Sequence, residues 1–192
     1  TQSRRFVVEA TVDRSVADQI DVGDRFVSGG TEQLRVETVN IYPTLQEGVR
    51  RVVVGITAQT RVKSGVTLYG SQPIQADTSI NVQTETYQLA GDIVTVGGVE
   101  PPGTASSRTV TIDVENIAPE RANAITTGAT EQSQDVITAQ VLSKVTQPAT
   151  ETIQSGGGFQ TIEHPTQLDL TMDIDLSVRE FQDGRIQFRG ES

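Results

Sequence analysis

A two-residue alternation of apolar and polar side chains constrains the fold of this chain more than any other feature. The clearest case is the segment 168–176, which reads Leu-Asp-Leu-Thr-Met-Asp-Ile-Asp-Leu, and the segments 6–13 and 110–115 repeat the pattern. A period of two gives a strand one buried and one solvated face, as in antiparallel sheets and barrels. The frequent Val, Thr and Ile residues also favour strands. We therefore expect an all-β fold.

Signals for helices are short. The segment 119–125 begins with Pro119, a favoured residue at the first helical position, and Gly128 follows it. The segment 15–20, followed by Gly23, has the same character. We expect one short helix in each half of the chain.

These two helix signals belong to an internal repeat with an offset of 105 residues. The first strand of each half shows a one-residue slip, and the connection before the segment 168–176 is longer than the one before its counterpart, 52–56. The chain therefore reads as a tandem duplication of two small β-barrel or sandwich-like domains. The landmarks that superpose are Ala17 and Ala122, Ile20 and Ile125, Gly23 and Gly128, Val36 and Val141, and Pro43 and Pro148.

The predicted domains are unequal at their ends. We place a first β repeat at 1–98, a Pro/Gly/Ser linker at 99–107 and a second β repeat at 108–192. The first repeat continues through apolar segments near residues 74–96, but the second stops where their counterparts would begin. We expect the second repeat to lack its last strands, through truncation or because another chain supplies them. Residues 185–189 should then lie at an open sheet edge.

The charge pattern narrows the partners and the setting. The 192 residues carry a net charge of −10, with thirteen arginines but only two lysines, Lys63 and Lys144. This balance argues against nucleic acid or an anionic membrane surface as partner. A diffuse acidic, lysine-poor surface is typical of proteins in high salt, although an ordinary acidic protein stays open. The lack of cysteine excludes disulfides and thiolate chemistry.

The order of these elements resembles the family catalogued as domain of unknown function 4330. The second half carries the fuller match, through 114–117, 122–128, Glu163-His164-Pro165 and 188–191, whereas the first half lacks the Glu-His-Pro element. Members are common in halophilic archaea and have one N-terminal membrane span before such β domains. The resemblance implies a tethered domain outside the membrane, and the start at Thr1 instead of Met suggests a processed or partial chain.

Few residues suggest chemistry. The row Asp169, Asp173 and Asp175 is a weak candidate for a metal site, because a linear row rarely converges on a cation; a solvated, salt-adapted face is the main interpretation. His164, the single histidine, is expected in a loop without a catalytic role. The Gly156–Gly158 run reads as a turn, since no Gly-Lys-Ser/Thr ending follows. We expect no catalytic residue and no cofactor.

These observations favour a non-enzymatic, exported structural or interaction module. We expect a protein partner or self-association, no nucleic acid, and a native chain anchored by an N-terminal membrane span at the extracellular face of the cell membrane. The alternative is a β domain that binds a small ligand or an ion, in a barrel mouth or between the repeats. An enzyme is the third possibility.

Overall fold

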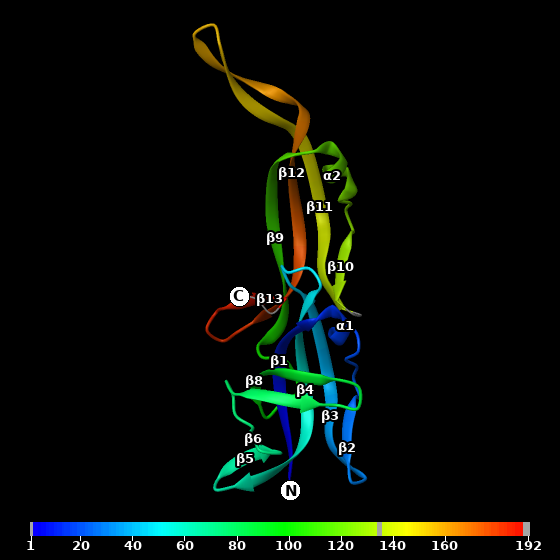
Figure 1. Ribbon diagram of the computed structural model, residues 1–192. Helices are drawn as coiled ribbons and strands as arrows, with labels where there is room; N and C mark the ends of the chain where they lie inside the picture. The colour runs from blue at the N-terminus through cyan, green and yellow to red at the C-terminus, as the bar shows by residue number, and fades with distance from the viewer. Residues whose placement is uncertain (1, 134–135, 190–192) are drawn as a thin grey trace. The chain divides into compact units, whose positions relative to one another are not determined.

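The computed structural model describes residues 2–133 and 136–189 and consists mainly of strands, with two short helices (Figure 1). It confirms the all-β prediction: a curled, half-barrel sheet accompanies a second sheet. The chain divides into two compact units. One contains residues up to Thr104 together with those from Phe181 onward, and the other is Ala105–Glu180.

The first unit contains an eight-stranded antiparallel sheet. Its main path runs β2-β3-β4-β1-β8-β7, and β5 pairs with β4 and β6. The elements are β1 (Gln2–Asp13), α1 (Arg14–Ala17), β2 (Arg25–Ser28), β3 (Thr31–Pro43), β4 (Val49–Lys63), β5 (Val66–Tyr69), β6 (Gln72–Pro73), β7 (Ser79–Gln83) and β8 (Gln88–Val96).

The core of the first unit lies on the concave side of this curled sheet. Phe6 and Val8 of β1 and Ile56 of β4 are fully buried there, as the period-two pattern predicts. The β7–β8 hairpin closes over them with further buried residues. These are Ile80, Val82, Leu89 and Ile93.

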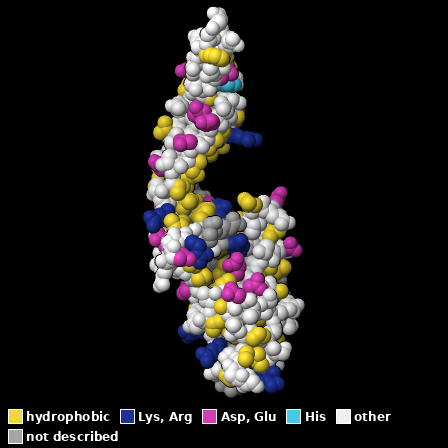
Figure 2. Space-filling model, turned by 90° about the vertical axis from the view of Figure 1, so that its left-hand side faces the viewer, with side chains coloured by type: hydrophobic (Ala, Val, Ile, Leu, Met, Phe, Trp, Pro, Cys, Tyr) yellow, Lys and Arg dark blue, Asp and Glu magenta, His cyan; other side chains and the backbone are white. Residues whose placement is uncertain are grey.

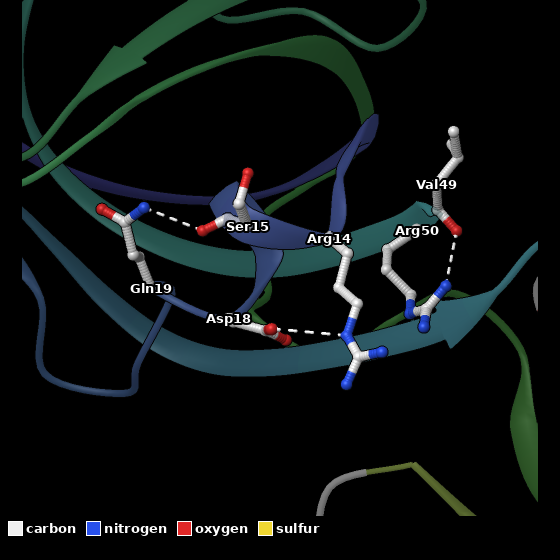
Figure 3. Close-up of polar contacts among 6 residues, drawn as sticks. All are labelled: Arg14, Ser15, Asp18, Gln19, Val49 and Arg50. Carbon is white, nitrogen blue, oxygen red and sulfur yellow. Dashed lines mark hydrogen bonds and ion pairs between the residues drawn. The ribbon is translucent and has the colours of Figure 1, made fainter. Parts of the chain in front are cut away.

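Helix α1 is a single turn that joins β1 to the rest of its repeat. Its ends are held by polar contacts, which Figure 3 shows: the Arg14 guanidinium lies 3.5 Å from the Asp18 carboxylate, and the Gln19 amide donates to the Ser15 carbonyl. The Arg14 N–H donates to the Gly48 carbonyl at 2.7 Å, which ties the helix to the turn after β3. The predicted helix at 15–20 is therefore present but shorter.

The other sheet lies mainly in the second unit, although its last strand, β13, falls within the residues from Phe181 onward that belong to the first unit. Its strand order is β10-β11-β12-β13, and β9 also pairs with β12. The elements are β9 (Thr104–Ile117), α2 (Pro119–Ala124), β10 (Thr130–Ser133), β11 (Val136–Ser155), β12 (Gly158–Glu180) and β13 (Ile186–Phe188). Within the described residues β13 ends the strand order, so residues 186–188 occupy a sheet edge as predicted.

The two repeats have the same strand order, as a duplication would produce. The order β2-β3-β4-β1 of the first repeat matches β10-β11-β12-β9 of the second. Turn hydrogen bonds also coincide: the Gly23 N–H donates to the Val36 carbonyl at 2.8 Å, and the Gly128 N–H to the Val141 carbonyl at 2.8 Å. Both glycines have positive φ, +96° and +85°, which L side chains rarely adopt.

The strand register is repeated as well. Leu34 lies opposite Ala58 as Ala139 lies opposite Leu176, and Pro43 pairs with Arg50 as Pro148 pairs with Leu168. The bulge between Val36 and Thr38 recurs between Val141 and Ser143. Register and bulges depend on many side chains at once, so their recurrence extends the likeness of the two repeats beyond strand order.

The boundary between the repeats is shorter than the predicted linker. β9 begins at Thr104, so residues 104–107 belong to a strand. Residues 97–103 connect β8 to β9, and Pro101 is buried.

Candidate interaction surface of the second repeat

The two repeats differ in what lies beside their first strands, β1 and β9. In the first repeat β8 lies along β1, with Val7 opposite Thr95 and Glu9 opposite Asp92. In the second repeat, within residues 2–133 and 136–189, β9 is hydrogen-bonded to β12 alone. β9 has 14 residues, whereas β2 and β10 at the opposite edges have four. A long unpaired edge can accept another strand.

The backbone N–H and C=O groups that point to the free edge of β9 can be identified by comparison with β1. The Arg5 carbonyl of β1 accepts a hydrogen bond from the Gly97 N–H, on the β8 side. Because of the one-residue slip, the counterpart of Arg5 is Thr109. Alternation in an antiparallel strand then directs the N–H and C=O groups of Thr109, Thr111 and Asp113 to the free edge.

The apolar face beside this edge is also uncovered. Ile112 is 39% exposed, whereas its counterpart Val8 is fully buried. Val110 and Val114 are half-buried, whereas their counterparts Phe6 and Ala10 are 0% and 5% exposed. In the first repeat the β7–β8 hairpin covers this face. The described part of the second unit has no counterpart of that hairpin.

A long hairpin arm distinguishes the second repeat further. In the first repeat, residues 44–49 form a short connection from β3 to β4. The equivalent residues of the second repeat, 149–167, form a ribbon in which Thr150 pairs with Glu163 and Ser155 with Gly158. We call residues 150–163 the arm; it projects beyond the rest of its sheet in Figure 1. Both residues of its tip, Gly156 and Gly157, have positive φ, as a tight hairpin turn requires.

No residue of the arm is buried. Phe159 is 82% exposed beside the tip and Ile153 is 37% exposed. Figure 2 shows hydrophobic side chains at the surface in the upper part of the view, which contains the arm. A two-stranded ribbon without a hydrophobic cover is marginally stable in water, so the arm is a candidate contact element.

The predicted aspartate row lies on one face of β12, and its carboxylates accept hydrogen bonds. Asp173 accepts from the Thr111 hydroxyl at 2.7 Å and the Ser143 hydroxyl at 2.8 Å. Asp169 accepts from the Asn116 N–H at 3.1 Å, and Asp175 from the Thr109 hydroxyl at 3.5 Å.

These contacts tie β9 to β12. The two hydroxyl donors hold the pKa of Asp173 below its usual value. Carboxylates two residues apart on a strand are separated by about 7 Å, which is too far to share one ion. Within the described residues no group of three or more Asp, Glu, His or Cys side chains could hold a metal ion.

His164 lies where the arm joins the sheet. Between the pairs Pro148–Leu168 and Thr150–Glu163, the single residue Ala149 lies opposite the four residues 164–167. This part of β12 is therefore a bulge and not the predicted loop. The Thr166 N–H donates to Nδ1 of His164 at 3.3 Å, and the side chain is half-buried. The turn predicted at Gly156–Gly158 is the tip of the arm.

A cavity of about 430 Å³ opens in the first unit. Its wall includes the aromatic rings of Phe26 and Tyr69 and has no charged residue. The hydroxyl of Tyr69 is protonated at neutral pH and can donate a hydrogen bond, and burial raises its pKa further. Five glutamines complete most of the wall: Gln33, Gln59, Gln72, Gln83 and Gln88.

Comparisons with family models, curated proteins and solved structures find no significant match to this chain. Within the described residues no helix is both long and apolar enough to cross a membrane. The resemblance to domain of unknown function 4330 therefore stays a prediction.

Sequence reasoning found the aspartate row but missed the arm and the open edge of β9. The signal for the arm was the extra length between Pro148 and Leu168, compared with Pro43 and Arg50 in the first repeat. Residues 159–162 read as a strand after the turn at Gly156–Gly158, but treating the whole length as a connection hid its pairing with β11. The uncovered edge has no local signal, because residues 110–114 alternate as residues 6–10 do.

Proposed function

We propose that the chain is a non-enzymatic structural or interaction module whose second repeat accepts a β strand along the free edge of β9. The observation that carries this proposal is the comparison of repeats. The same edge, in the same register, is covered by β8 in one repeat, whereas no described residue pairs with it in the other. Strand addition of this kind supplies main-chain hydrogen bonds along the edge and side-chain pockets on its apolar face.

The setting is part of the proposal. The acidic, lysine-poor composition and the resemblance to a membrane-anchored family support a tethered module at the extracellular face of the cell membrane. An interaction module in that setting needs an accessible surface, and the open edge of β9 supplies one.

A peptide that reproduces the covering hairpin tests the proposal. A labelled synthetic peptide with the sequence of residues 79–96 should bind the full chain, because it presents the strands that cover β1. Binding is followed by fluorescence anisotropy, and amide exchange should slow at Thr109, Thr111 and Asp113. A scrambled peptide is the control.

The chain variant Ile112→Lys separates specific from general binding. A lysine at this position puts a charge on the apolar face, so the peptide should lose about tenfold or more in affinity. The matched control is Val62→Lys, which also replaces a β-branched apolar residue by lysine, at a position 56% exposed in the first unit. Absence of peptide binding, or equal binding by both variants, contradicts strand addition at β9.

A second candidate function is binding of a small uncharged polar ligand in the cavity of the first unit. Amide groups and aromatic rings without charge suit a hydroxyl-rich molecule such as a saccharide. Titration of the full chain with maltotriose, followed by calorimetry, tests this candidate. Gln59→Ala should abolish any binding, whereas the exposed Gln147→Ala should leave it unchanged.

A further inference from the structure

The second repeat contains both an uncovered edge and an uncovered hairpin, and these two features are complementary. We propose that the arm of one copy of this chain docks along the β9 edge of a second copy. This inference rests on the proposed function, since it names the strand that the edge accepts. Among residues 2–133 and 136–189, no hairpin covers the edge. The arm is a hairpin without a cover.

In the first repeat β1 pairs with residues 92–96 of β8, and β7 pairs with the preceding part of β8. β7 and β8 form five register pairs, from Ser79 with Asp92 to Gln83 with Gln88. The arm forms six, from Thr150 with Glu163 to Ser155 with Gly158. Each strand of the arm has six paired residues, one more than the five-residue segment 92–96 of β8 that lies along β1, so an arm strand is long enough to lie along the β9 edge.

One face of the arm has the chemistry for this contact. Ile153 pairs with Gln160 and Ile162 with Glu151, so both isoleucines lie on the same face as diagonal neighbours. In the covering hairpin, Val82 and Leu89 are directly paired on the face that meets the core. We expect Ile153 and Ile162 to pack against the exposed Ile112 of the second copy.

This contact joins copies head to tail. Donor and acceptor are different surfaces of the same protein, so each copy can give its arm to one neighbour and accept the arm of another. Such head-to-tail contacts form rings or filaments, depending on whether the rotation between copies closes.

Salt should control this assembly. Each copy carries a net charge of −10, so copies repel one another in dilute buffer. At 1 M salt the screening length is about 3 Å, which removes most of this repulsion. Assembly should therefore increase with KCl concentration.

Sedimentation velocity of the full chain tests the inference at several protein concentrations, in dilute buffer and in molar KCl. The wild-type protein should form species larger than a dimer in molar KCl. Ile112→Lys removes the acceptor and Ile153→Lys removes the donor, so each should weaken association by about tenfold or more. The matched control is Leu45→Lys, at a fully exposed loop residue of the first unit.

An equimolar mixture of the two single variants gives the sharpest result. The intact arm of Ile112→Lys can dock on the intact edge of Ile153→Lys, so the mixture should form dimers and nothing larger. A second donor variant, with residues 149–167 replaced by the sequence of residues 44–49, removes the arm at equivalent register positions. It should behave like Ile153→Lys.

The outcomes separate the inference from the proposed function. If the donor variants assemble like wild type while Ile112→Lys does not, the edge accepts another strand and the arm is not the donor. If the wild-type protein stays monomeric but binds the peptide of residues 79–96, the arm inference is wrong and strand addition stands. If it stays monomeric and binds no such peptide, both are wrong.

Discussion

Asp173 in the second repeat occupies the register position of Gly55 in the first, and both lie beside a hydroxyl group at the same bulge. Thr38 lies opposite Gly55, accepts a hydrogen bond from the Gly55 N–H and donates to the Val99 carbonyl at 2.6 Å. Ser143 lies opposite Asp173 and donates to its carboxylate at 2.8 Å. The carboxylate thus replaces the backbone carbonyl of the segment that leaves β8.

Gly55 is predicted to be intolerant of any side chain. A Cβ on residue 55 would overlap the carbonyl of Val99 and the hydroxyl of Thr38. Gly55→Ala should therefore lower the free energy of unfolding of the first unit by about 1–3 kcal/mol or more, because the segment at Val99 must move. Chemical denaturation measures this change. Gly98→Ala, where a Cβ meets no atom within 4 Å, is the control and should be nearly neutral.

Asp173 should stabilise the second unit in a pH-dependent way. Its folded pKa is lowered by hydrogen bonds from Thr111 and Ser143, so its contribution is present above its unfolded pKa of about 3.9. That contribution is lost as the pH falls through the folded pKa. Asp173→Ala should lower the melting temperature at neutral pH, and the difference from wild type should shrink in acid. A difference that stays constant or grows as the pH falls would contradict this role.

The sequence predicted the repeat because its landmarks depend on local geometry. Gly23 and Gly128 need positive φ in the same turn, and such positions keep glycine. Whether a hairpin covers the first strand of each repeat could not be predicted in this way. Val8 and Ile112 have the same local pattern, but their burial depends on whether a distant hairpin lies over them. The aspartate row was placed on the correct face of its strand, yet its donors come from residues distant in sequence.

Lys144 is predicted to stabilise the second unit through α2. Its ammonium group donates to the Ala122 carbonyl at 2.6 Å and the Ile125 carbonyl at 2.8 Å, at the C-terminal end of the helix. Lys144→Met removes both bonds and should cost about 1–3 kcal/mol in the free energy of unfolding. The control is Lys63→Met, at an exposed lysine, for which chemical denaturation should show little change in the free energy of unfolding. Equal losses from the two variants would mean that the helix contact contributes nothing.

The salt dependence of folding tests the halophilic setting separately from assembly. The chain has 25 acidic and 15 basic residues, so repulsion between carboxylates opposes the folded state in dilute buffer. Thermal melts from about 0.1 to about 3 M KCl should show a rising midpoint, because the screening length falls to about 3 Å near 1 M. The melts should be made on Ile112→Lys at low protein concentration, so that association does not add to the apparent stability. A midpoint that stays level or falls with KCl would favour an ordinary acidic protein, the alternative left open by the composition.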